Sequence, residues 1–301
     1  MSLSHFTLSG STYEQGVAHG KLLKESIKNN LEVYISRFKK EAGINKKDLL
    51  TNTSIYFDIL RKQSPEYVNG INGIATGSNI NLIEIAMLNL RYELLYHALG
   101  KRYINEAIDG CTSFALLPES TENHNLIIGQ NWDWIPDIEC VLITSIDIDG
   151  LKRLSFTEAG IFGGKPGMNS GGIGLVVNGM YTTKDDFSRF EKPFHLRCYE
   201  VLRSQNMHAA LEVLTNTPRS CTANFIIGES PQRVVNIELA PDIFRLIDTK
   251  DGILSHANHF DNPEILGIKE PPNPNRYLSE FRQKRMECLL NYHKPCNLQN
   301  L

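Results

Sequence analysis

The stretch Asp109-Gly-Cys-Thr-Ser113 lies where the chain changes from helical to strand-forming sequence. Before it, residues 87–96 (MLNLRYELLY) have the apolar spacing of a helix. After it, residues 111–117 (CTSFALL) have the composition of a strand. This change predicts two parts, a helical segment 1–110 and a β-rich segment 111–301.

The bond between Gly110 and Cys111 is suited to a backbone cut. A Cys111 thiolate can attack the carbonyl of Gly110 in an N→S acyl shift, and glycine tolerates the strained geometry of that attack. Hydrolysis would leave Cys111 as a new N-terminus, whose α-amine has a pKa of about 8 and can act as the base for its own thiol. The alternative is that Cys111 is a buried strand residue that acts as a small hydrophobe.

A second strand is expected within residues 125–134 (NLIIGQNWDW), after the turn-rich segment 118–124. Two adjacent strands joined by a loop of that length should pair as a hairpin. Asp133, near the end of the second strand, would then lie beside Cys111.

These residues resemble the acyl-CoA:6-aminopenicillanate (isopenicillin N) acyltransferase family of self-cleaving N-terminal-nucleophile (Ntn) hydrolases, and more distantly acid ceramidase and the N-acylethanolamine amidases. The motifs that carry the resemblance are Gly110-Cys-Thr-Ser113, Gly129-Gln-Asn-Trp-Asp133, Phe156-Thr-Glu-Ala-Gly160, Gly167-Met-Asn-Ser-Gly-Gly-Ile173 and His256-Ala-Asn-His259. They stand in compatible order over nearly the whole chain. The resemblance implies a four-layer αββα Ntn-hydrolase sandwich, and the grouping of strands with segregated helices is compatible with this α+β class.

The resemblance also implies roles for single residues. Asp133 matches a residue that orients the nucleophile, and its alternative is an ordinary strand-end carboxylate. Asn258 matches the oxyanion donor, a task that suits a side-chain amide because it presents N–H groups without ionising; the alternative is a polar turn. Ser113 matches a hydroxyl used in self-cleavage together with Gly110 and Cys111, or is a satisfied strand serine.

The implied function is a self-processing cysteine amidohydrolase or acyltransferase that acts on small N-acyl amides or acyl thioesters through acyl-Cys111. Fragments 1–110 and 111–301 would stay associated, and no metal or bound cofactor is needed, with acyl-CoA as a candidate substrate. One alternative is a papain-type hydrolase in which His256 or His259 serves as the base. The other is a catalytically impaired or non-enzymatic homologue.

Two departures from the family pattern bear on these alternatives. Gln130 stands where the ceramidase-type relatives carry Arg, which favours the acyltransferase branch. The family usually continues beyond the Arg276-containing helix into closing strands, one of which carries a functional Arg. Those strands are expected to be missing here, leaving a sheet edge uncovered and the activity in doubt.

Composition is that of an ordinary globular chain, with 301 residues, 41% of them hydrophobic, and a net charge of −3. The charge gives no reason to expect nucleic acid or an anionic membrane as partner. We expect no membrane-spanning run and no signal peptide. Six cysteines without CxxC spacing argue against a zinc site or a disulfide framework. A reducing, cytoplasmic location is therefore expected.

Periodicity predicts the individual elements. Helices are expected at 13–42, 47–61, from 79, at 194–204, 207–215 and 276–292, with a capping box at Ser11–Glu14. Pro65 is expected to open a further element. Strands are expected at 6–8, 113–117, 126–130, 140–148, 152–157, 174–178, 224–228, 233–238 and 244–248.

The substrate pocket is expected to have its rim within residues 156–180. This stretch contains three large apolar residues and two charges, Glu158 and Lys165, that would cancel; the apolar residues are Phe162, Met168 and Met180. It favours an apolar acyl group with a small polar amine, unless the apolar residues merely fill the core. Cys221 imitates the nucleophile motif but is expected to be a core cysteine.

Overall fold

The computed structural model describes residues 3–101, 110–273, 275–299 and 301. Asp109 and the rest of segment 102–109 lie outside the described residues. The helices are α1 (Thr12–Leu22), α2 (Lys24–Arg37), α3 (Lys46–Gln63), α4 (Pro65–Ser78), α5 (Leu82–Lys101), α6 (Phe194–Arg203), α7 (Met207–Thr215) and α8 (Arg276–Tyr292). The strands are β1 (His5–Gly10), β2 (Thr112–Leu116), β3 (Ile127–Asn131), β4 (Cys140–Asp147), β5 (Lys152–Glu158), β6 (Gly167–Asn169), β7 (Ile173–Gly179), β8 (Ala223–Glu229), β9 (Arg233–Leu239), β10 (Phe244–Ile247) and β11 (Ile253–His256).

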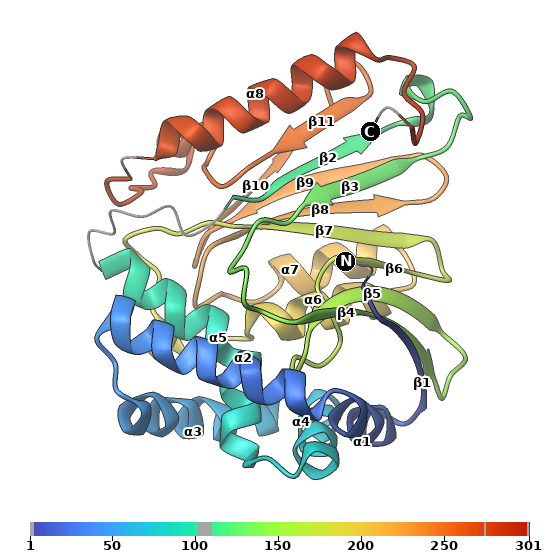
Figure 1. Ribbon diagram of the computed structural model, residues 1–301. Helices are drawn as coiled ribbons and strands as arrows, with labels where there is room; N and C mark the ends of the chain where they lie inside the picture. The colour runs from blue at the N-terminus through green and yellow to red at the C-terminus, as the bar shows by residue number, and fades with distance from the viewer. Residues whose placement is uncertain (1–2, 102–109, 274, 300) are drawn as a thin grey trace.

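The strands form two stacked sheets between helical layers (Figure 1). The larger sheet has the order β1-β4-β5-β6-β7-β8-β9-β10, and the smaller has the order β11-β2-β3. Helices α6 and α7 lie on the face of the larger sheet that is turned away from the smaller one, and α8 covers the outer face of the smaller sheet. The expected α+β sandwich of helix, sheet, sheet and helix layers is therefore confirmed.

Alternation along β2 explains why the smaller sheet sits between two layers. Ala115 points inward and packs with Val176 of the larger sheet. Its neighbours Phe114 and Leu116 point outward and pack with Leu290 of α8. Because side chains of a strand alternate between its two faces, five consecutive buried residues in β2 require cover on both sides.

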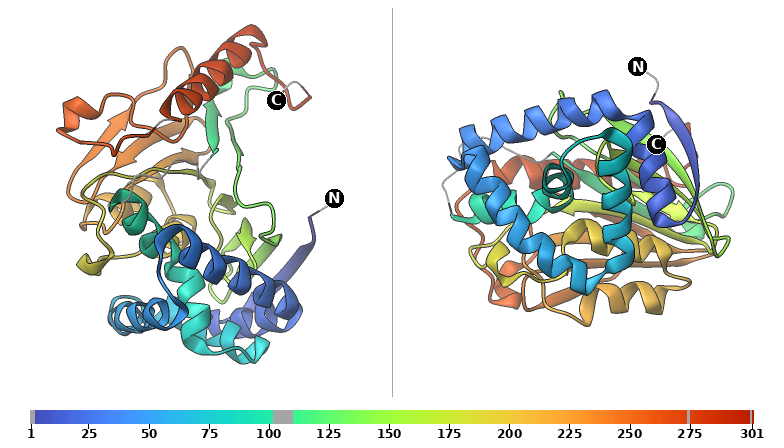
Figure 2. Two further views of the ribbon diagram at one scale, coloured as in Figure 1. Left: turned by 60° about the vertical axis from the view of Figure 1, so that its left-hand side comes forward. Right: turned by 90° about the horizontal axis from the view of Figure 1, so that it is seen from below.

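The first hundred residues are an integral part of this core. Strand β1 pairs in parallel with β4 at the edge of the larger sheet. Helices α1–α5 gather below the sheet (Figure 2), and side chains such as Tyr34 and Leu88 belong to the same hydrophobic cluster as Ile143 and Phe225. The predicted helical character of this segment is confirmed for its described residues.

One predicted helix is broken in the structure. The 13–42 pattern becomes α1 and α2, which meet at Leu23, followed by a π-helical turn at Phe38–Ala42. Leu23 is buried and leaves helical geometry there (φ −115°, ψ 22°), because tertiary packing outweighs local periodicity. The Ser11–Glu14 capping box is present as expected.

Two short strands were missed by the sequence prediction. β6 and β11 both lie outside the strand ranges expected from the sequence, and β11 pairs with β2. Within the described residues after β11 there is α8 and an isolated bridge between Thr121 and Cys296, but no further strand. β3 accordingly forms an edge of the smaller sheet.

His19 of α1 supports a prediction about acid stability. The imidazole Nε2 accepts a hydrogen bond from the Gly160 N–H (2.9 Å), and burial lowers the pKa of His19 to about 4. Unfolded histidine titrates near 6.5, so between pH 6.5 and 4 the unfolded state binds more protons than the folded state. As the pH falls through this window, His19 lowers the free energy of unfolding by up to about 3 kcal/mol. Urea unfolding of the wild type and His19→Gln, which keeps an acceptor, should diverge in pH dependence over that window. Equal slopes would contradict this.

Candidate active site

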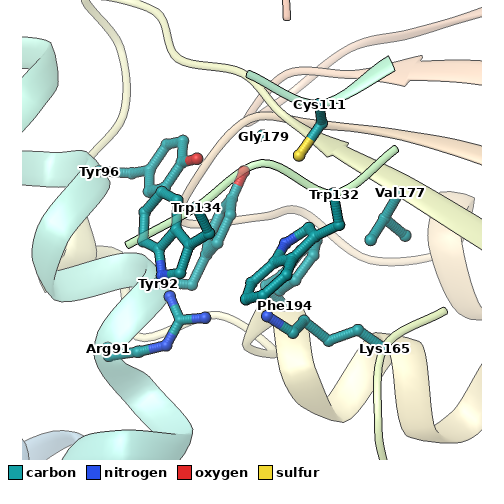
Figure 3. A pocket seen from close by; sticks show the side chains of 10 residues that line it. All are labelled: Arg91, Tyr92, Tyr96, Cys111, Trp132, Trp134, Lys165, Val177, Gly179 and Phe194. Carbon is teal, nitrogen blue, oxygen red and sulfur yellow. The ribbon is translucent and has the colours of Figure 1, made fainter. Parts of the chain in front are cut away.

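Cys111 lies directly before β2, and its thiol points into a small cavity of about 30 Å³ (Figure 3). The residue is buried. Aromatic rings and two cationic side chains surround it; they are Tyr92, Tyr96, Trp132, Trp134, Phe194, Arg91 and Lys165. The arrangement offers a sulfur nucleophile in a sheltered, mostly aromatic setting.

The predicted hairpin is confirmed, since β2 pairs antiparallel with β3 and Thr112 lies opposite Asn131. This pairing brings Asp133 against Gly110, whose N–H donates to the Asp133 carbonyl at 3.4 Å. A Cβ atom added to Gly110 would lie only 2.8 Å from the Asp133 Cβ and closer still to its carboxylate. Asp133 therefore touches the residue before Cys111, and its own side chain is exposed.

Asn258 follows β11 and contacts one residue of the cavity wall, Gly179. Its backbone N–H donates to Ser279 Oγ (2.8 Å) and its Nδ2 donates to the Gly179 carbonyl (2.9 Å). Gly179 lines the Cys111 cavity. The fold thus places the candidate oxyanion donor, more than a hundred residues further along the chain, at the edge of the candidate nucleophile's pocket.

Arg282 of α8 joins these groups and was missed by the sequence analysis. It donates to Asn258 Oδ1 (2.7 Å) and to the Cys111 carbonyl (3.5 Å). On an amphipathic helix that also carries Arg276 and Arg285, nothing in the local sequence separates an inward-facing arginine from the solvated ones.

Ser113 is the second residue of β2 and is fully buried. Its hydroxyl donates to Asn178 Oδ1 (2.9 Å), and Asn178 in turn donates to Asn224 Oδ1 (2.8 Å). Gln130, opposite Ser113 in the hairpin, uses its amide to bind both backbone groups of Val177. These polar side chains connect the two sheets directly behind the candidate nucleophile.

A buried ionic cluster lies deeper under the cavity. Glu158 pairs with both Arg91 and Lys165, and it accepts a hydrogen bond from Tyr34 (2.5 Å). Burial opposes ionisation of Glu158, but the two cations outweigh it and hold its pKa far below the usual range. Burial, aided by Arg91, lowers the pKa of Lys165 despite Glu158. One anion thus faces two cations.

The prediction that Phe162, Met168 and Met180 form the rim of the pocket is wrong. Phe162 packs against Tyr67 and Tyr199, Met180 is buried beside Phe260, and Met168 is 57% exposed. Of the stretch 156–180, the cavity takes Lys165, Val177 and Gly179 instead. Phe162, in the loop after β5, and Met180, directly after β7, therefore fill the core, whereas Met168 of β6 faces solvent.

His256 was considered as a base for the thiol. It is buried, with Nε2 against Glu238 Oε1 (2.9 Å) and Nδ1 against the Ala257 carbonyl (3.0 Å). Burial would lower the pKa of His256, but Glu238 outweighs this and raises it. Asp261 completes a cluster with the spacing of a metal site. Both ring nitrogens of His256 face oxygen acceptors, however, so both serve as hydrogen-bond donors and neither offers a lone pair to an ion. We therefore assign an ion pair.

His259 lies on the other side of Asn258. Its Nδ1 contacts Ser279 Oγ (2.7 Å), and burial, with the charges of His256 and Arg276, lowers its pKa to about 4.

A larger cavity of about 490 Å³ adjoins the site at Asn258. Its wall includes Tyr181, whose ring contacts Tyr96 of the Cys111 cavity. The carboxylates at its rim outnumber the cations; the charged residues are Asp261, Glu264, Glu270 and Arg276. The two cavities thus flank the Asn258 amide, one aromatic and one acidic.

Cys221 is buried, as expected of a core cysteine, and no disulfide joins any of the six cysteines in the part of the chain that the structure describes. Among the described residues, no helix combines the length and apolar character needed to span a bilayer.

Comparison with known proteins shows which family this chain resembles. The curated acyl-coenzyme A:6-aminopenicillanic-acid-acyltransferase 40 kDa form of Emericella nidulans is 27% identical over 259 residues, which are 85% of this chain and 69% of that protein. An N-acylethanolamine-hydrolyzing acid amidase orthologue of Caenorhabditis elegans aligns with TM-score 0.43 and 17% identity, over 58% of this chain and 79% of that chain. Penicillin V acylase of Agrobacterium tumefaciens aligns with TM-score 0.34 and 12% identity, over 65% and 62%.

The model of the acyl-coenzyme A:6-aminopenicillanic acid acyl-transferase family matches residues 120–299. The matched part begins after Cys111 and contains Asp133, Asn258 and Arg282. Since it covers more than half of the chain, the chain belongs to the acyl-coenzyme A:6-aminopenicillanic acid acyl-transferase family.

Proposed function

We propose that this protein is a self-processing cysteine Ntn acyltransferase or amidohydrolase that acts on small N-acyl amides or acyl thioesters. The observation that carries the proposal is the position of the Cys111 thiol, which points into a cavity bordered by Gly179, the residue that the Asn258 amide binds. A nucleophile and a neutral N–H donor are the two groups that acyl transfer requires.

The first step is the backbone cut. Cys111 Sγ attacks the Gly110 carbonyl, the peptide nitrogen leaves as the α-amine of Cys111, and a thioester links Gly110 to Sγ. Water then hydrolyses the thioester, giving a Gly110 carboxylate and a free thiol. Fragments 1–110 and 111–301 stay associated in this proposal, which the β1–β4 pairing and the shared core support.

In turnover, the Cys111 α-amine takes the thiol proton and Sγ attacks the substrate carbonyl. The Asn258 N–H, with backbone N–H groups, stabilises the oxyanion, and Asp133 helps to hold the new N-terminus. The leaving amine or thiolate takes a proton and departs, and the acyl group remains on Sγ. Water then gives an acid, or an amine gives a new amide. These steps use no metal or bound cofactor.

The two cavities suggest where the two parts of the substrate would bind. The aromatic cavity at Cys111 would take the acyl arm, and the acidic cavity beyond Asn258 would take the leaving amine or the acceptor. The relative from Emericella nidulans is named for acyl-coenzyme A and 6-aminopenicillanic acid, so acyl-CoA is a candidate acyl donor. Cysteines outside disulfides suit a reducing compartment such as the cytoplasm.

A papain-type mechanism is less well supported. Both nitrogens of His256 are engaged by Glu238 and Ala257, and Nδ1 of His259 contacts Ser279. A non-catalytic role predicts that no acyl group forms on Cys111.

The proposed activity is tested with paired substrates on the purified chain. N-hexanoyl glycine, hexanoyl-CoA and a hexanoyl dipeptide are each supplied with water alone or with an added primary amine, and products are identified by mass spectrometry. We expect hexanoic acid to be released from N-hexanoyl glycine and hexanoyl-CoA in water. When the primary amine is present, we expect its hexanoyl amide as well. Preferred turnover of the peptide, or none at all, would contradict the proposal.

Gly110→Ala should slow the cut. The added Cβ would collide with Asp133, displacing the Gly110 carbonyl from the thiol. Since a displacement of about 1 Å can cost about 10²-fold, the cut, followed by intact mass, should slow by about 10- to 100-fold. Gly171→Ala is the control, because its added Cβ has no neighbour closer than 3.3 Å. Cutting of Gly110→Ala at the wild-type rate would refute this.

A further inference from the structure

Arg282 contacts both halves of the candidate site. Its Nη2 donates to Asn258 Oδ1 (2.7 Å) and to the Cys111 carbonyl (3.5 Å), and its Nε donates to Thr112 Oγ1 (3.3 Å). One half-buried side chain from α8 therefore spans from the start of β2 to the turn after β11.

The contact with Asn258 determines which way the amide faces. A guanidinium carries only donors, so it binds the amide oxygen and cannot bind the NH₂ group. With Oδ1 held by Arg282, Nδ2 must lie on the opposite side, where it donates to the Gly179 carbonyl (2.9 Å). That side borders the Cys111 cavity.

An oxyanion needs the NH₂ side of the amide. Nδ2 has two N–H groups, and the Gly179 carbonyl accepts one of them. The second is available to a negative oxygen that develops on a carbonyl attacked by Cys111. If the amide turned over, Oδ1 would face that oxygen and repel it.

We propose that Arg282 is a positioning residue that holds the Asn258 amide with its N–H groups toward the acylation site. It acts through Asn258 and does not itself contact the reacting atoms. This inference rests on the proposed function, and it adds a third element, α8, to a site otherwise built from β2 and the turn after β11.

The competing role for Arg282 is simply to attach α8 to the smaller sheet. Arg285, one helical turn further along α8 and exposed, is the matched control. Lysine at position 282 keeps a single donor and should retain part of the orientation, whereas alanine keeps none. A merely structural role predicts equal losses for both and no dependence on Asn258.

The test is a double-mutant cycle with p-nitrophenyl hexanoate and hexanoyl p-nitroanilide as probes. Variants are Arg282→Ala, Arg282→Lys, Asn258→Ala, the Asn258→Ala/Arg282→Ala pair and Arg285→Ala. Rates are divided by the amount of cut chain from intact mass; for a variant that stays uncut, the rate of the cut itself replaces turnover.

Removing an oxyanion donor costs about 10²–10³-fold in kcat, and we expect Arg282→Ala to lose about 10- to 100-fold in kcat with KM changed less than about 3-fold. Arg282→Lys should fall between, Arg285→Ala should match the wild type, and the pair should be no slower than Asn258→Ala. Additive losses, an unaffected Arg282→Ala, or an unaffected Asn258→Ala would overturn the inference. Full activity of Cys111→Ala would instead refute the proposed function.

Discussion

Cys111→Ala is expected to leave a single uncut chain of 301 residues with no measurable acyl transfer. The thiol is the attacking group of both proposed steps, so its loss removes the cut and the acyl-enzyme together. Loss of a nucleophile that works with its own base typically costs on the order of 10⁴-fold or more. Denaturing gels and intact mass measure the cut, and turnover of hexanoyl p-nitroanilide measures the activity.

Cys221→Ala is the matched control for this experiment. Like Cys111, Cys221 is buried, forms no disulfide and stands just before a strand. The control should be cut and active like the wild type. Two fragments in the Cys111→Ala preparation, separated at the same bond, would show that another group carries out the cut.

Glu158→Gln is expected to have the largest effect on stability. Glu158 is completely buried and is paired with Arg91 and Lys165, so a neutral side chain would leave two cations side by side in the interior. Breaking a buried pair in this way typically costs about 3–5 kcal/mol, which in a chain of this size corresponds to a Tm lower by about 6–10 °C.

The loss of stability in Glu158→Gln should also depend on pH. Burial already lowers the pKa of Lys165, and without Glu158 it has no opposing anion to retain its proton. Raising the pH should therefore neutralise Lys165 and reduce the deficit of the variant. Glu139→Gln, an exposed change next to β4, is the control and should leave Tm within about 1 °C. A Glu158→Gln chain as stable as this control would contradict the assignment of the cluster.

Much of the β-rich part could be predicted from sequence because its strands are long enough to alternate. β4 and β5 came within a residue of prediction, and α8 matches its predicted bounds at Arg276–Tyr292. All four residues of β11 are buried, so it shows no alternating pattern and is recognised only through its pairing with β2.

The site could be predicted in part. The hairpin put Asp133 near the Gly110–Cys111 bond, as expected, and Asn258 binds Gly179 at the edge of the Cys111 cavity. What local sequence cannot show is the partner from elsewhere in the chain. Arg282 binds Asn258 because it faces inward on α8. The charges of Glu158 and Lys165 were expected to cancel, but Arg91 also pairs with Glu158 and adds a second positive charge.

The most direct test of acyl transfer through Cys111 is the mass of the 111–301 fragment during turnover. The purified chain is mixed with p-nitrophenyl hexanoate and quenched in acid during the burst of p-nitrophenol release. The masses of its fragments are then measured by mass spectrometry before and after proteolytic digestion. The account predicts a 111–301 fragment heavier by one hexanoyl group, with the addition on the Cys111 peptide, and none in Cys111→Ala. Rapid turnover with no acyl group on Cys111, or with the group on another residue, would contradict it.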